Sequence, residues 1–240
     1  MQIFISKNNI LVNKKLNIPV EKNWFDPNFW HNQYNLHIEN SNEYHIKINK
    51  NIWILKQYRR KDFMQNIISD KFIYINPAYT KSFLELQMLE FTEKLSLPTP
   101  KAIAAHYHKQ GLMYSSSILI EKIPNAKSLL LWLQKNSIEI IIWKKIGITI
   151  AKFHSYGIDN KKLSIKNILF DGENIYFANF ESCIKRIYKG RWQSNNLIRL
   201  QQSFIIAAQT YGLKIQRMDL NIMLEAYNSY IKKLNKIKTS

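Results

Sequence analysis

Cysteine, glycine and long apolar runs are all scarce in this chain of 240 residues. The one cysteine, Cys183, excludes an intrachain disulfide and fits a reducing compartment. The most apolar stretch, residues 138–150, is interrupted by Lys144 and Lys145, and the N-terminus has no apolar core, so we expect neither a transmembrane segment nor a signal peptide. All 6 glycines lie at or after Gly111, which excludes a glycine-rich phosphate loop from the first part of the chain.

Acidic residues are also few. The chain has 17 Asp and Glu residues and 35 Lys and Arg residues, which gives a formal net charge of +18. This excess predicts an anionic partner, which is a nucleic acid, an anionic lipid surface or a phosphorylated substrate. Lysine outnumbers arginine 29 to 6, and valine occurs only at Val12 and Val20. Because Lys, Asn and Ile have A/T-rich codons, part of the charge reflects compositional bias.

The first half of the chain alternates strand-like and helical segments. Asp26-Pro27 predicts a helix start, with Asp26 as N-cap and Pro27 in the first turn. Apolar residues at helical spacing predict a second helix over residues 80–95. Strands are expected at residues 44–48, 51–56, 102–107 and 112–123.

The second half is mainly helical. Pro124-Asn125 breaks the chain and is the candidate hinge. Asp171-Gly172-Glu173 predicts a hairpin between two short strands, residues 167–170 and 174–180. Helices are expected at residues 126–135, 137–156, 194–211 and 218–236. A strand-rich lobe over residues 1–123, followed by a helical lobe over residues 124–240, predicts an α+β fold in two lobes.

A stretch beginning at His154 resembles the catalytic-loop region of a protein-kinase-like fold. The spacing of His154, Gly157 and Asn167 fits that pattern. The two positions that carry its chemistry hold Asn160 and Lys162, and Lys162 stands where the resemblance implies the catalytic aspartate. An unperturbed lysine stays protonated near neutral pH and has no acceptor lone pair, so it does not accept a hydroxyl proton.

The other parts of such a site also have candidates. Lys56 fits the strand lysine that grips nucleotide phosphates, and Glu85 fits the helix glutamate that orients this lysine. Asn167, Asn179 and Glu181 are the candidate Mg²⁺ ligands, with Asn179 in the position of the metal-binding aspartate. An exposed strand lysine and a solvated helix glutamate are the alternative interpretation of Lys56 and Glu85.

Several nearby residues are expected not to restore the missing chemistry. The segment 40–44, where such folds cover the phosphates, has no glycine, and Glu43 would repel phosphate, so reduced nucleotide affinity is expected. Asp159 is the carboxylate nearest to Lys162 in the sequence, but it precedes the loop asparagine by eight residues instead of five.

The histidines do not indicate a metal site. His106 and His108 predict a surface pair on an edge strand rather than a metal site. His154 is expected to brace the catalytic loop.

Over nearly its whole length the chain resembles the 3-deoxy-D-manno-octulosonic acid (Kdo) kinases of the lipopolysaccharide core kinase group. The resemblance rests on aromatic, basic and proline-containing motifs spread along the chain. They lie at Phe25–Trp30, Leu55–Arg60, Thr80–Glu85, Leu97–Ala105, Ile118–Ala126 and Arg191–Phe204.

The resemblance implies a bilobal protein-kinase-like fold and transfer of the ATP γ-phosphoryl group, with Mg²⁺, to a Kdo hydroxyl on a lipid A precursor. It also implies a peripheral protein on the cytoplasmic face of the bacterial inner membrane, with that anionic glycolipid and the membrane surface as partners and no nucleic acid.

Three hypotheses follow. The first is a pseudokinase, because Lys162 and Asn179 replace two aspartates and the glycine loop is missing as well. The second is a slow but active Kdo kinase that uses Glu181 or Asp159. The third is a nucleic-acid-binding protein, which only the charge favours, since no zinc, helix-turn-helix or RNP pattern is present.

Overall fold

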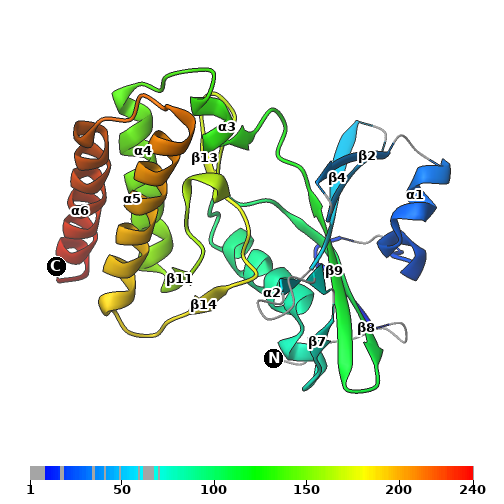
Figure 1. Cartoon of the computed structure of the whole chain (residues 1–240). Coiled ribbons are helices and arrows are strands. Elements are labelled where there is room, and N and C mark those ends of the chain that lie inside the picture. Colours follow the sequence, from blue (N-terminus) through cyan, green and yellow to red (C-terminus); the bar gives the residue numbers. More distant parts are fainter. Residues whose placement is uncertain are drawn as a thin grey trace. The chain divides into compact units, whose positions relative to one another are not determined.

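The chain divides into two compact units (Figure 1), one of residues 1–94 and 100–122 and the other of residues 95–99 and 123–240. This computed structural model describes residues 9–16, 19–33, 36–40, 42–48, 50–58, 60–61, 68–69 and 71–239. The N-terminal residues 1–8, on which the expected absence of a signal peptide depends, lie outside this part. Residues 95–99 group with the second unit although they precede the boundary expected from the sequence.

The first unit is built on an antiparallel sheet with strand order β1-β8-β9-β4-β3-β2, and β7 also pairs with β9. Strands were expected at four places, and the structure confirms all four as β3, β4, β8 and β9. The strands are β1 (Ile10–Val12), β2 (Leu36–Asn40), β3 (Glu43–Ile48), β4 (Asn51–Gln57), β7 (Phe72–Ile73), β8 (Ala102–Gln110) and β9 (Met113–Glu121), beside a separate pair of β5 (Arg60–Lys61) and β6 (Ile68–Ser69).

Two predicted helices of this unit are confirmed. Helix α1 (Pro27–Gln33) begins as expected, because Asp26 Oδ1 accepts the backbone N–H of Asn28 at 2.9 Å. Helix α2 (Lys81–Lys94) buries Phe83, Leu86 and Leu89 and packs against β8 and β9. The other face of the sheet packs against Phe25 and Trp30 of the N-terminal segment, in one apolar cluster with Trp53, Leu55 and Leu119.

The prediction that His106 and His108 form a surface pair is wrong for His106. Strand β1, which was not predicted, pairs with β8 and places Ile10 opposite His106. His106 therefore does not lie on an edge strand, and its side chain is buried against Phe25, with ring centroids 5.0 Å apart, while His108 beyond the end of β1 stays exposed. The edge of the sheet could not be located without knowing that residues 10–12 extend it.

Helices dominate the second unit, with short strand pairs between them. They are α3 (Leu129–Leu133), α4 (Ile140–Ser155), α5 (Arg191–Tyr211) and α6 (Arg217–Thr239). The strands are β10 (Lys127–Ser128), β11 (Ile158–Asn160), β12 (Ile168–Phe170), β13 (Ile175–Phe177) and β14 (Cys183–Lys185). The predicted hairpin is confirmed as β12–β13, with Asp171 Oδ1 accepting the N–H groups of Glu173 and Asn174 in its turn.

One predicted helix of this unit is shorter than expected. Residues 126–135 were predicted to be helical, but Lys127 and Ser128 pair with β12, and only residues 129–133 are α-helical. The Ser128 hydroxyl then caps α3 by accepting the N–H of Leu131 at 3.3 Å. A strand partner 41 to 43 residues away in the sequence (Lys127 opposite Phe170, Ser128 opposite Leu169) thus overrides the local helical pattern.

Helices α4 and α6 approach each other closely at a glycine. A Cβ atom on Gly147 would lie 2.0 Å from the backbone oxygen of Met223, so no larger residue fits without displacing α6. Trp143, Ile146 and Ile150 of α4 are buried in this unit. In the described part of the chain, no helix combines the length and the apolarity needed to cross a membrane.

Candidate functional site

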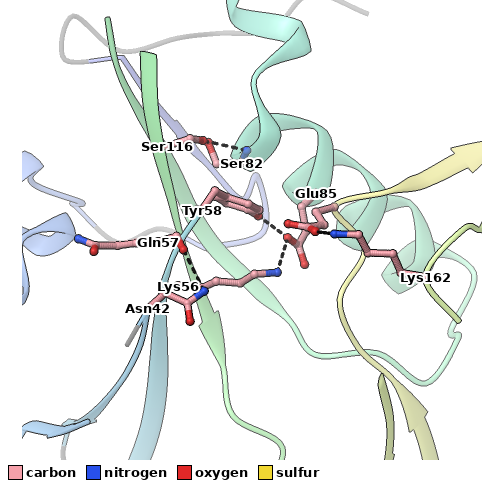
Figure 2. A network of polar contacts seen from close by, with 9 residues as sticks. Asn42, Lys56, Gln57, Tyr58, Ser82, Glu85, Ser116 and Lys162 are labelled. Carbon is pink, nitrogen blue, oxygen red and sulfur yellow. Dashed lines mark hydrogen bonds and ion pairs between the residues drawn. The ribbon is translucent and has the colours of Figure 1, made fainter. Parts of the chain in front are cut away.

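A buried ion pair joins β4 to α2 in the first unit (Figure 2). Lys56 Nζ lies 3.2 Å from Glu85 Oε2, and the two side chains are 10% and 2% exposed. The Tyr58 hydroxyl donates a hydrogen bond to the same carboxylate, and Lys56 Nζ lies 4.9 Å from the centroid of the Tyr58 ring. The alternative interpretation of an exposed lysine and a solvated glutamate is therefore wrong.

The turn before β3, which has no glycine, is held against the end of β4. Asn42 Nδ2 donates to the carbonyl oxygen of Gln57 at 3.3 Å, and the Gln57 N–H donates to the Asn42 carbonyl at 2.9 Å (Figure 2). Glu43 is paired directly opposite Lys56 in the β3–β4 register. Residue 41 of this turn lies outside the described residues. A carboxylate thus stands on the strand beside the lysine that was predicted to grip phosphate.

In the second unit, the two predicted asparagines close the loop between β11 and β12. Asn160 Oδ1 accepts the backbone N–H of Lys162 at 2.9 Å, and Asn167 Nδ2 donates to the Lys162 carbonyl at 2.8 Å. Asn160 is 5% exposed, and its Nδ2 has no hydrogen-bond partner among the described residues. The backbone of residue 162 is held from both sides, whereas its side chain is 52% exposed.

The Lys162 ammonium forms an ion pair with the carboxylate of Glu181, whose side chain is 15% exposed. The segment that carries Glu181 lies beside the loop, since the Ala178 N–H donates to the Asn167 carbonyl at 2.9 Å. Asn179 has a φ of 64°, in the left-handed region that Asn and Asp adopt more readily than most residues. The structure thus brings these predicted residues of the second unit together around the Lys162–Glu181 pair.

The residues present do not fit a magnesium ion. Asn167 and Asn179 offer neutral amide oxygens, and Glu181 offers the one carboxylate of the predicted set. Mg²⁺ prefers carboxylate and phosphate oxygens. Because the Lys162 ammonium already balances the charge of Glu181, the set has no net negative charge. Across the described ranges, no group of three or more His, Cys, Asp or Glu side chains is arranged to hold a metal.

Asp159 is engaged in a different set of contacts. The Nε and Nη2 atoms of Arg186 both lie 3.0 Å from its Oδ2, and Asn196 Nδ2 donates to its Oδ1 at 2.8 Å. The carboxylate is 3% exposed. Asp159 therefore links β11 to the residue after β14 and to α5, and both of its oxygens already have donors.

His154 contacts both of the last two helices from the end of α4. It is 4% exposed, its Nδ1 lies 3.0 Å from the Tyr227 hydroxyl, and its ring lies edge-on to Trp192 at 4.9 Å between centroids. Burial lowers the pKa of His154 to about 4, although the negative charge of Asp159 opposes this shift. A neutral imidazole thus braces α4 against α5 and α6.

The free energy of unfolding is expected to decrease as the pH falls from 6.5 to about 4. Burial lowers the pKa of both His154 and His106 from 6.5 to about 4, so in this range the unfolded chain binds more protons than the folded one. The stability from the neutral histidines is present above pH 6.5 and is lost below it. His154→Gln should flatten the dependence, because it removes one of the two buried histidines. Urea unfolding midpoints at several pH values test this, and an unchanged slope in His154→Gln would contradict it.

Three residues around these groups were missed by the sequence interpretation: Tyr58, Arg186 and Asn196. Tyr58 lies two residues after Lys56, and the period of two in a strand could have indicated that both side chains point the same way. Arg186 and Asn196 lie 27 and 37 residues from Asp159 in the sequence. No local pattern signals such contacts.

Comparisons with known proteins agree with this fold. Among solved structures, the chain is similar to WaaP in complex with acyl carrier protein, with a TM-score of 0.55, 12% identity, and coverage of 82% of this chain and 79% of that one. An antiparallel sheet with the Lys56–Glu85 pair and a helical unit with the Asn160–Asn167 loop define an α+β, protein-kinase-like fold.

The sequence comparisons identify the family. The model of the lipopolysaccharide kinase (Kdo/WaaP) family matches residues 28–227. The chain is 30% identical over 209 residues to the 3-deoxy-D-manno-octulosonic acid kinase of Vibrio vulnificus (strain CMCP6), covering 85% of this chain and 88% of the relative. It is 31% identical over 173 residues to the kinase of the same name from Vibrio parahaemolyticus, covering 72% of each. The chain belongs to the lipopolysaccharide kinase (Kdo/WaaP) family.

Proposed function

We propose that this chain is a Kdo kinase family protein in which phosphoryl transfer is strongly impaired or lost. The observation that carries the proposal is the ion pair of Lys162 with Glu181. The family resemblance implies that position 162 is the position of the catalytic aspartate, which accepts the proton of the acceptor hydroxyl. In this chain the position is occupied by Lys162. An ammonium group does not accept a proton, and loss of general-base help slows such reactions by about 10²- to 10⁴-fold.

The pair also removes the charge that a metal would need. Asn179 replaces the metal-binding aspartate, and the remaining carboxylate of Glu181 is neutralised by Lys162. We therefore propose that Asn167, Asn179 and Glu181 no longer form a magnesium site. Lys162 and Glu181 would then act as a structural pair that holds the catalytic loop beside the segment that follows β13.

The contacts of Lys56 in the first unit support the proposal that this residue still binds a nucleotide phosphate. Lys56 is oriented by Glu85, and the Tyr58 hydroxyl fixes the carboxylate of Glu85. We propose that the first unit is the nucleotide-facing part and that Lys56 binds phosphate of ATP. Glu43 opposite Lys56 and the turn without glycine favour weak affinity.

The buried Lys56–Glu85 pair is also the observation that favours the second candidate, a slow but active Kdo kinase. Such an enzyme needs a carboxylate near the acceptor hydroxyl. Asp159 is 3% exposed and engaged by Arg186 and Asn196, so it is the weaker of the two candidates for this role. Glu181 would first have to leave Lys162.

By the family resemblance, the acceptor is a Kdo hydroxyl on a lipid A precursor, and the protein binds peripherally to the cytoplasmic face of the inner membrane. The formal net charge of +18 supports an anionic glycolipid and an anionic surface as partners. A nucleic acid is a third candidate, which the charge alone favours.

The test is a transfer assay with purified protein, Mg-ATP and a Kdo-bearing lipid A precursor. The Vibrio vulnificus relative serves as the positive control. We expect transfer at least about 100-fold slower than in the relative. Transfer at a rate similar to that of the relative would refute the impaired-kinase proposal. Stabilisation of the chain by ATP without transfer would separate nucleotide binding from chemistry.

A further inference from the structure

A run of eight consecutive exposed residues, 184–191, joins β14 to α5 in the second unit. At its centre, Ile187 is 88% exposed and Tyr188 is 83% exposed. These are the two highest exposures among the large apolar side chains described in this unit. Single exposed apolar residues are common on protein surfaces, whereas contiguous exposed apolar groups with a polar rim mark interaction sites.

The loop is held in place by its backbone, so these two side chains are presented outward. The Arg186 N–H donates to the Gly157 carbonyl at 2.7 Å, and the Arg186 side chain is bound to Asp159. On the other side, Trp192 Nε1 donates to the carbonyl oxygen of Tyr188 at 3.0 Å. A loop ordered in this way loses little conformational entropy when it binds.

Positive charge surrounds the two apolar side chains. Lys185, Lys189 and Arg191 are exposed within the run, and residues 182–191 contain no acidic side chain. Lys189 Nζ donates to Asn235 Oδ1 at 2.9 Å and so connects the loop to the end of α6.

The end of α6 adds further charge at the same place. Lys232, Lys233 and Lys236 are exposed there, together with Ile237, and no acidic residue follows Glu225. Figure 1 shows β14, the start of α5 and the C-terminal end of α6 at the same end of this unit.

We propose that residues 184–191 and 232–237, the basic–apolar surface, dock this protein onto an anionic phospholipid bilayer. Aliphatic and tyrosine side chains partition into the headgroup region, while lysines and arginines bind anionic lipid. A nucleic acid would use the charges but would leave Ile187 in water. The inference rests on the proposed peripheral membrane association and deepens it, because it names the residues that make the contact.

Vesicle co-sedimentation of the full chain tests the apolar part of this surface. The vesicles are phosphatidylcholine alone, and phosphatidylcholine with about one third phosphatidylglycerol. The wild type should bind the anionic vesicles and release them as salt is added. Ile187→Gln/Tyr188→Gln should weaken binding by roughly tenfold or more. The matched control Ile205→Gln/Ile206→Gln, which alters two exposed isoleucines of α5, should leave binding unchanged.

A second pair of variants tests the charge. Lys232→Gln/Lys233→Gln should weaken binding by about tenfold or more. Lys135→Gln/Lys214→Gln removes the same charge from exposed positions in the loops after α3 and α5 and should have a much smaller effect. Circular dichroism confirms that each variant is folded.

Three results would overturn the inference. Equal loss in the two lysine variants would show that only net charge matters, and equal loss in the two apolar variants would show that Ile187 and Tyr188 make no specific contact. Tighter binding to duplex DNA than to anionic vesicles, with the same variants affected, would assign the surface to nucleic acid. No vesicle binding by the wild type would refute peripheral association as well, while leaving the result of the transfer assay unaffected.

Discussion

The double change Lys162→Asp/Asn179→Asp is expected to raise phosphoryl transfer to the Kdo acceptor by at least about 100-fold over the natural chain. The first change replaces an ammonium with a carboxylate that accepts the hydroxyl proton. The second adds a carboxylate at the predicted metal position, and loss of Lys162 leaves the charge of Glu181 unbalanced, so that the set suits Mg²⁺.

The structure favours the survival of the loop in this variant. Asn160 and Asn167 hold the backbone N–H and carbonyl of residue 162, not its side chain. The left-handed conformation of residue 179 suits Asp as well as Asn. New side chains should therefore enter a loop that keeps its present backbone.

The matched control is Lys161→Asp/Asn179→Asp, which makes the same charge change one residue earlier. We expect it to stay at the activity of the natural chain, because residue 161 is not the residue whose backbone both asparagines hold. Transfer is measured with labelled ATP and the Kdo-bearing lipid A precursor. Equal activity of the two double variants would contradict the role assigned to position 162.

Glu85→Ala is expected to lower the free energy of unfolding by about 3 kcal/mol. The Lys56 and Glu85 side chains are 10% and 2% exposed, so truncation leaves a buried ammonium without its carboxylate and removes the acceptor of the Tyr58 hydroxyl. The control Glu93→Ala removes a more exposed ion pair of the same helix, that of Glu93 with Lys15. Such surface pairs contribute about 0–1 kcal/mol.

Urea denaturation followed by circular dichroism measures both variants. Glu85→Gln should fall between wild type and Glu85→Ala, because its amide oxygen still accepts from Tyr58 but carries no charge. If Glu85→Ala were no less stable than Glu93→Ala, the pair would not contribute to the stability of the first unit. Loss of ATP-dependent stabilisation in a folded Glu85 variant would further support Lys56 as the phosphate-binding residue.

Local patterns predicted much of the fold because they depend on few residues. Asp26-Pro27 marked the start of α1, and the spacing of Phe83, Leu86 and Leu89 marked α2. The Asp171 turn marked the β12–β13 hairpin. Each signal comes from hydrogen bonds or apolar periodicity within one or two turns of chain.

Local sequence patterns gave wrong predictions where pairing with a distant strand determined the secondary structure or the position of a residue in the sheet. Residues 127–128 pair with β12 and shorten the expected helix, and β1 extends the sheet past β8, so that His106 does not lie on an edge strand. The β11–β14 pair was also not predicted, although it positions the residues on both sides of the Lys162–Glu181 contact. Pairing between segments far apart in the sequence has no local signature.

The sequence by itself determined the family, the α+β order of the elements and the exchange of two aspartates for Lys162 and Asn179. Motif spacing and residue chemistry depend on identity alone. Only the tertiary structure decided that Lys56 and Glu85 form a buried pair, that Asp159 is engaged by Arg186 and Asn196, and that the ammonium of Lys162 meets Glu181. The reason is physical: whether a charge is buried, paired or exposed depends on which other segments fold against it.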